Sequence, residues 1–142
     1  MRRALLLLLL VAGLVQAEVS LPLIISGGTL ACRGSIDGHR GLLLIDSGSS
    51  VTCLFPAQVA QHSYRFRKVR MTAHTAAGPQ RIREVVRGAR FVVGGITYRA
   101  TDLVVLPDCN TEAIGLLGCD FLTATGARID LARKRLVLTR KP

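Results

Sequence analysis

An acidic residue follows directly on a wholly apolar segment in the first third of the chain. The run 42–45 leads into Asp46, and Ser47, Gly48 and two further serines come next. Such an apolar run predicts a buried strand, and a lone carboxylate at its end is costly unless neighbours hydrogen-bond it or its charge is shared. Gly48 permits a sharp turn and a close approach of another chain or a ligand. Asp46 is therefore a catalytic candidate, and a plain Asp-Ser-Gly turn is the structural alternative.

A second informative segment begins about 70 residues later and reads Ala-Ile-Gly-Leu-Leu-Gly-Cys-Asp-Phe-Leu over 113–122. It places Leu116, Leu117 and Gly118 directly before a predicted short helix. Two more apolar stretches, 129–131 and 136–138, follow. Together with Asp-Ser-Gly-Ser, this pattern resembles the retropepsin-like family of aspartic proteases over about 36–138. The tetrapeptide Thr75-Ala76-Ala77-Gly78 is similar to the Thr-Ala-Asn-Gly flap of exported bacterial members, with Ala77 replacing Asn, and an ordinary hairpin turn is its alternative.

The resemblance implies a mainly β acid-protease barrel with one short C-terminal helix, acting as an endopeptidase on peptide or protein substrates. Such chemistry needs two carboxylates about 3 Å apart that share one proton and a water. The chain has one such motif, so the resemblance implies a homodimer in which each protomer supplies Asp46. No cofactor and no metal are implied.

The resemblance also assigns supporting roles around the carboxylate. Ser47 would bond across the dimer axis, the Gly48 N–H would point at the carboxylates, and Ser49 would add a hydrogen bond to Asp46. Bonds to the charged form of a carboxyl favour that form, so an acidic pH optimum is expected. Residues 116–118 would pack behind the loop. Pocket walls are expected near 51–54, at the flap, and at Leu116 or Leu117.

A non-enzyme alternative stays open, because one motif in a chain that does not dimerise would leave a catalytically silent exported β domain that binds peptides in a groove. The outer segments 21–26 and 136–139 bear on this choice. In viral relatives the chain termini interleave into a shared interface sheet, and both segments here are apolar enough to do so.

The remaining pattern is that of a small β domain. Hydrophobic residues make up 49% of the 142 residues, 14 are glycine and only six are aromatic. Period-two alternation and short apolar runs between turn residues favour strands. Asp37-Gly38, Gly78-Pro79 and Gly94-Gly95 are predicted turns. Strands are predicted at 21–26, 30–36, 41–45, 51–55, 68–75, 80–86, 90–93, 96–106, 128–131 and 136–139, with helical turns at 56–61 and 120–125.

The N-terminus has the pattern of a secretory signal. Arg2 and Arg3 precede an apolar stretch that ends in Val15-Gln16-Ala17, and this stretch is short for a bilayer core of about 30 Å. Cleavage after Ala17 would leave one domain over 18–142 in the periplasm or outside the cell, and its formal charge would fall from +10 to +8 as the two arginines are removed. An uncleaved signal anchor is the alternative.

Export would allow the four cysteines, Cys32, Cys53, Cys109 and Cys119, to form two disulfides in three possible pairings. A zinc site is disfavoured, because no Cys-x-x-Cys pair occurs and the three histidines stand at no ligand spacing. Basic clusters at 65–70, 81–90 and 133–135, the first with Tyr64 and Phe66, are compatible with nucleic acid. Charge runs are most often solvated faces. An exported protein seldom meets nucleic acid, so weak attraction to anionic envelope surfaces or acidic peptides is favoured over nucleic-acid binding.

Overall fold

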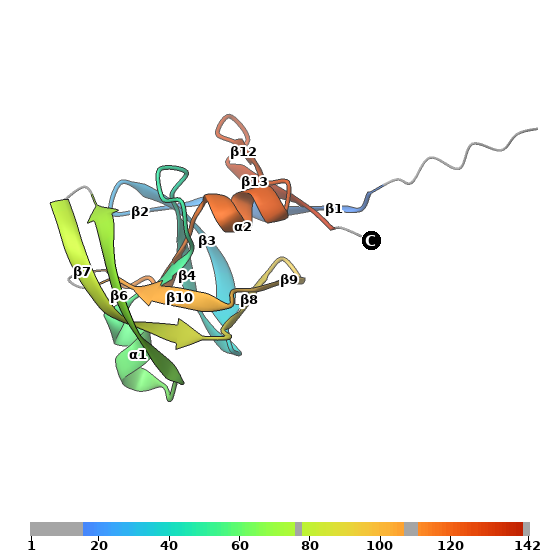
Figure 1. Cartoon of the computed structure of the whole chain (residues 1–142). Helices are drawn as coiled ribbons and strands as arrows, with labels where there is room; N and C mark the ends of the chain where they lie inside the picture. Colours follow the sequence, from blue (N-terminus) through green and yellow to red (C-terminus); the bar gives the residue numbers. More distant parts are fainter. Residues whose placement is uncertain (1–15, 76–77, 107–110, 141–142) are drawn as a thin grey trace, which may run out of the picture.

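The computed structural model describes residues 16–75, 78–106 and 111–140, and strands dominate it (Figure 1). The two helices are α1 (Pro56–Gln61) and α2 (Cys119–Ala124). The strands are β1 (Glu18–Pro22), β2 (Ile24–Ser26), β3 (Thr29–Ile36), β4 (His39–Ile45), β5 (Cys53–Leu54), β6 (Phe66–Thr75), β7 (Gly78–Arg87), β8 (Arg90–Val93), β9 (Ile96–Arg99), β10 (Asp102–Val105), β11 (Gly115–Leu117), β12 (Arg128–Asp130) and β13 (Arg135–Thr139). The predicted mainly β fold with a short C-terminal helix is confirmed.

One large curled sheet carries most of the strands, in the order β6-β7-β10-β5-β11-β4-β3-β8-β9, with β2 added to β3. Its centre brings together segments that are distant in sequence. Strand β11 runs parallel to β4, with Leu117 beside Ile45, and antiparallel to β5, with Leu116 beside Cys53. The two segments that stood out in the sequence are therefore direct neighbours at the middle of the sheet.

A separate three-stranded sheet has the order β1-β13-β12 and lies next to α2 (Figure 1). Leu21 of β1 is opposite Leu136 of β13, so the two ends of the same chain pair with each other. The outer segments therefore find their partners within one chain in this structure.

Two predicted strands are each divided into two in the structure. The segment predicted at 21–26 is divided between β1 and β2 at Leu23, directly after Pro22, which has no N–H to donate to a ladder. The segment predicted at 96–106 is divided between β9 and β10, because the chain leaves β8 at Ala100 and turns to pair with β7. The turn at Asp37-Gly38 is as predicted, since both residues have positive φ, of 48° and 87°, as a type I′ hairpin requires.

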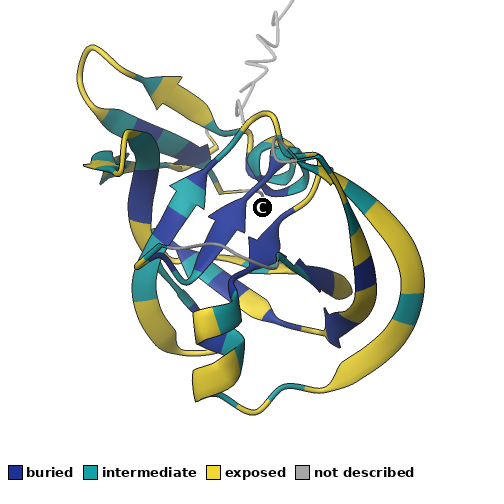
Figure 2. Ribbon diagram, turned by 90° about the vertical axis from the view of Figure 1, so that its left-hand side faces the viewer, coloured by how far each residue is buried: buried dark blue, intermediate teal, exposed yellow. Residues whose placement is uncertain are grey.

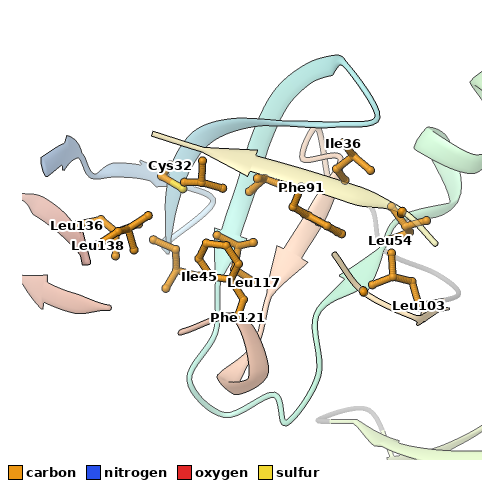
Figure 3. Close-up of a cluster of buried hydrophobic side chains, with 14 of the residues drawn as sticks. Cys32, Ile36, Ile45, Leu54, Phe91, Leu103, Leu117, Phe121, Leu136 and Leu138 are labelled. Atoms are coloured by element: carbon orange, nitrogen blue, oxygen red, sulfur yellow. The ribbon is translucent and has the colours of Figure 1, made fainter. Parts of the chain in front are cut away.

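Buried side chains form two clusters on opposite sides of β11. Leu117 packs with Ile45, Phe91 and Phe121 in the larger cluster (Figure 3), and Leu116 belongs to the smaller one with Cys53 and Ile82. Burial of a large apolar side chain contributes about 1.5–3 kcal/mol to folding. Strand β11 is consequently buried on both faces. Exposed positions are frequent on longer strands such as β6 and β7, away from this centre (Figure 2).

Among the described residues, no helix is both long enough and apolar enough to cross a bilayer.

Candidate active site

Asp46 lies immediately beyond the last residue of β4. Its backbone N–H donates to the carbonyl of Leu117 on the neighbouring β11, at 3.1 Å. This bond continues the parallel ladder in which Ile45 is beside Leu117. The carboxylate is therefore carried by two adjacent central strands with packed side chains behind them, and Asp46 itself is half-buried.

The loop after β4 folds back on the carboxylate. The N–H of Gly48 donates to Asp46 Oδ1 at 2.8 Å, and the N–H of Ser49 donates to the backbone carbonyl of Asp46 at 3.2 Å. A Cβ added to Gly48 would lie 3.1 Å from Asp46 Oδ1, so glycine leaves room for the carboxylate at this turn. The loop therefore holds one carboxylate oxygen in place by a main-chain donor.

The two serines beside this turn have different surroundings. The Ser49 hydroxyl donates to the carbonyl of Val51 at 2.7 Å. The expectation that this hydroxyl bonds to Asp46 is therefore wrong, because the chain turns and places the carbonyl two residues ahead within its reach. Ser47 is exposed, and its carbonyl accepts a hydrogen bond from Cys119 Sγ at 3.0 Å.

Gly118 lies where the loop after β4 meets the start of α2. A Cβ at this position would overlap the backbone C and O of Val51 and would lie 3.0 Å from the carbonyl of Ser49. That same carbonyl accepts the N–H of Cys119 at 2.8 Å. The close approach predicted for Gly118 is present, and its partner is the backbone of the loop itself.

A partly buried polar network behind the loop was not anticipated from the sequence. Thr52 Oγ1 donates to Asp120 Oδ1 at 2.7 Å and accepts the N–H of Gly118 at 3.1 Å. Asp120 also accepts the N–H of Phe121 at 2.8 Å and the hydroxyl of Tyr98 at 2.9 Å. Burial raises the pKa of Tyr98 to about 12, and the bond to Asp120 with its negative charge adds to that rise. The network joins β9, α2 and Thr52, the residue directly before β5.

A signal for this network was available in the sequence. Thr52 stands at the head of the otherwise apolar run 52–55, and Asp120 lies in the first turn of a helix. A single hydroxyl at a position that becomes 1% exposed must have a partner, because an unsatisfied buried polar group is costly.

The expected pocket walls need correction. Leu54 and Leu117 are fully buried and Leu116 is 7% exposed, so these leucines belong to the core. Val51, at 44% exposure, is the residue of this set that is open to solvent. At the predicted flap, Thr75 Oγ1 donates to the carbonyl of Gly78 at 2.9 Å. Ala76 and Ala77 lie outside the described residues.

The predicted disulfides are not found among the described cysteines. Cys32 on β3 is three strands away from β5, which carries Cys53, so their Cα atoms are about 14 Å apart at about 4.8 Å per strand. A disulfide needs about 4.4–6.8 Å between Cα atoms. The Cys119 thiol bonds to the carbonyl of Ser47 instead, and Cys109 lies outside the described residues.

Metal ligands do not gather in the part of the chain that the structure describes, where no group of three or more His, Cys, Asp or Glu side chains is arranged to hold an ion. His39 and His62 are stacked on each other, with ring centroids 3.3 Å apart.

Solved structures with the same fold include an aspartic protease, a further protease and a protease-like domain. A retropepsin-like aspartic protease from Rickettsia conorii is 21% identical, with a TM-score of 0.57 over 87% of this chain and 90% of that one. EIAV protease, complexed with the inhibitor HBY-793, is 20% identical, with a TM-score of 0.57 over 72% and 93%. The retroviral protease-like domain of Ddi1 from Leishmania major is 18% identical, with a TM-score of 0.57 over 80% and 94%.

A comparison with curated proteins finds no match. The model of the aspartyl protease family matches residues 32–121, which is more than half of the chain and includes both Asp46 and the segment around Gly118. The chain therefore belongs to the aspartyl protease family, with a retropepsin-like fold.

Proposed function

We propose that the protein is an aspartic endopeptidase that works as a homodimer, with Asp46 of each protomer at the shared active site. The observation that carries the proposal is the position of the carboxylate. Asp46 lies at the end of a buried central strand, bonded by the Gly48 N–H and anchored to β11, in a chain of the aspartyl protease family. A single such carboxylate per chain makes two-fold association the direct route to a pair.

In the proposed reaction the two carboxylates share one proton, because like charges about 3 Å apart do not both ionise readily. The ionised carboxylate removes a proton from a water as its oxygen attacks the scissile carbonyl carbon. The protonated carboxyl supports the carbonyl oxygen, and a proton then passes to the leaving amine as the C–N bond breaks. Activity is expected to be highest at acidic pH and to fall once the pair loses its shared proton.

The surroundings of the loop support this assembly. Ser47 is exposed beside Asp46, so its hydroxyl is available to a second copy. The packed contact between Gly118 and Val51 holds the loop from behind, which keeps the carboxylate in one orientation. Because the carboxylate is already held in place, less conformational entropy is lost when the reacting groups meet.

The test is replacement of Asp46 by Asn. Cleavage of a peptide library at acidic pH should be sensitive to pepstatin in the native chain and fall more than about 1000-fold in Asp46→Asn, since one general acid–base group contributes roughly 10²–10⁴-fold. Asp37→Asn is the matched control, because Asp37 lies in the β3–β4 turn and Asn tolerates its positive φ of 48°. Undiminished cleavage by Asp46→Asn would show that the mechanism is wrong.

The second candidate is a catalytically silent β domain that binds peptides, and one observation favours it. Strands β1 and β13 pair with each other within the chain, so the terminal segments do not require a second copy to satisfy their ladder. Sedimentation of the native chain discriminates between the two candidates. A monomer at all concentrations and pH values, with no cleavage, would support the binding domain.

We also propose export with cleavage after Ala17. The signal-like pattern of the first 17 residues supports it, as does the start of β1 at Glu18, directly after the proposed cut. The mature chain isolated from the periplasm or medium should begin at Glu18 by mass spectrometry. A product that retains residues 1–17 would support a signal anchor.

A further inference from the structure

The long hairpin of β6 and β7 carries a strong excess of positive charge. Between positions 65 and 87 the chain has seven Lys and Arg residues against a single acidic residue, Glu84. In the described part of the chain, Arg67 is the one member of this set in an ion pair, with Asp102 at 2.5 Å. The other positive charges of the hairpin are in no ion pair within the described residues.

These charges line a hollow in the hairpin. Its volume is about 1040 Å³, and all of its lining residues come from β6 and β7, among them Lys68, Arg70, Arg81 and Arg83, together with Glu84. The register shifts between Lys68 and Met71, where β6 has one more residue than β7. A bulge of this kind bends and twists a strand pair, so the hairpin is curved where the charges gather.

The hairpin has an apolar and a charged side. Ile82 and Val85 of β7 are buried in the same cluster as Leu116, the residue next to the Asp46 anchor. Arg81 and Arg83 flank Ile82 and are exposed, and neighbouring side chains of a strand point to opposite faces. The buried side fixes the hairpin to the central sheet, and the charged side is left open.

Strand β6 is also the edge of the large sheet, and among the described residues it pairs with β7 alone. The free backbone groups of an edge strand can pair with an added extended chain. Side chains on one face of such an added chain recur about every 7 Å. Arg81 and Arg83, at alternate positions of β7, have the same spacing.

We propose that the charged face of the β6–β7 hairpin binds an acidic, extended segment of the polypeptide that the protease cleaves, outside the scissile bond itself. This inference rests on the proposed function, since it names the class of substrate. A polypeptide fits better than an anionic membrane, because the charges line a hollow whereas a bilayer presents a broad surface.

The binding test uses the full chain with Asp46→Asn, so that no probe is cut. The probe is a fluorescent 12-residue peptide of alternating Glu and Val, compared with its Gln-for-Glu analogue by anisotropy. The Glu peptide should bind more tightly, and less so as salt rises, because screening weakens exposed charge pairs. Adding Arg81→Gln and Arg83→Gln should weaken binding by about tenfold, as expected for two lost exposed contacts.

The matched control removes two charges from another hairpin. Arg90 and Arg99 are exposed and face each other across β8 and β9, so the Arg90→Gln, Arg99→Gln pair changes net charge equally. Binding of the Glu peptide should change less than twofold. Equal losses in both double variants would show attraction by overall charge and overturn the proposal. Binding to phosphatidylglycerol vesicles that depends on Arg81 and Arg83, without binding of the Glu peptide, would overturn it in favour of a membrane.

Cleavage by the native chain separates this inference from the proposed function. If acidic peptides bind through Arg81 and Arg83 but no peptide is ever cut, the protease assignment fails and the binding face stands. If peptides are cut at Asp46-dependent rates that do not differ between Glu and Gln flanks, and the Glu peptide does not bind, the protease assignment stands and the acidic-segment proposal fails.

Discussion

The region that contains Asp46, Thr52, Gly118 and Asp120, here called the corner, differs from the β6–β7 hairpin. The two regions differ in how many contacts hold each side chain in place. At the corner, Asp46, Gly118 and Asp120 are each held by main-chain or side-chain hydrogen bonds between segments that are distant in sequence. On the hairpin, Arg81, Arg83 and Lys68 extend into solvent from a two-stranded ladder at the edge of the sheet.

Under the proposed function, this difference would correspond to two tasks of a protease. A carboxylate that must meet a scissile bond needs a position defined to a fraction of an ångström, so its support is packed and hydrogen-bonded. Charges that attract a substrate segment act over several ångströms and tolerate mobile side chains. Changes at the corner should therefore affect stability and chemistry together, whereas changes on the hairpin should affect substrate choice with little effect on folding.

The largest effect is expected for Gly118→Ala. Its Cβ would overlap the backbone of Val51, which has no flexible side-chain end to move aside. We expect a loss of about 3 kcal/mol in the free energy of unfolding by urea titration, because overpacking against backbone forces the chain apart. Gly28→Ala is the control: its φ is 79° but no atom lies within 4 Å of the added Cβ, so only a strain of about 1 kcal/mol applies. Equal losses would mean that the close approach at Gly118 does not matter.

A smaller effect is expected for Thr52→Val, which keeps the shape and removes the hydroxyl. The Gly118 N–H would lose its acceptor and Asp120 would lose one donor, at a cost of about 2 kcal/mol. Exposed Thr97→Val should change stability by less than about 0.5 kcal/mol. Thermal unfolding of both variants measures the difference. An unchanged stability of Thr52→Val would show that the network does not stabilise the corner.

A pH-dependent effect is expected from Cys32, in the core cluster behind the corner. Burial raises the pKa of this thiol to about 12 from its ordinary value of 9.0. At a pH between these two pKa values, the thiol loses its proton in the unfolded chain and keeps it in the folded chain. The free energy of unfolding therefore falls as pH rises, by up to about 1.4 kcal/mol per pH unit. Urea titrations at pH 8.5 and 10.5 should show a steeper fall for the native chain than for Cys32→Ala. Parallel slopes would contradict burial of the thiol.

The smallest effect is expected on the hairpin, for Arg67→Gln. The hydrogen bond from Arg67 lowers the pKa of Asp102, so the pair's contribution is present above the ordinary carboxyl pKa and is lost as pH falls through the lowered value. Because both groups are exposed, the midpoint of thermal unfolding at neutral pH should not change measurably. A clear destabilisation would show that the hairpin is held by its charges and would weaken the contrast between the two regions.

Local sequence patterns were sufficient for most elements and for the acidic motif. The hairpin turn at Asp37-Gly38, the strand β8 and the helix α1 fall where turn residues, alternation and a leading Pro56 predict them. The split of 96–106 into β9 and β10 was not predictable in this way, because the segment is continuously strand-like and its bend depends on which neighbours it pairs with.

The sequence by itself determined that a carboxylate follows a buried strand, that a tight turn comes next, and that a second glycine-bearing segment completes the family pattern. These features depend on residue type and near neighbours. Only the tertiary structure decided that Ser49 bonds to Val51, that Thr52, Asp120 and Tyr98 form one network, and that Cys32 and Cys53 are too far apart to pair. The reason is physical: hydrogen-bond partners and distances across a sheet are set by strand order and register, which join residues that are distant in sequence.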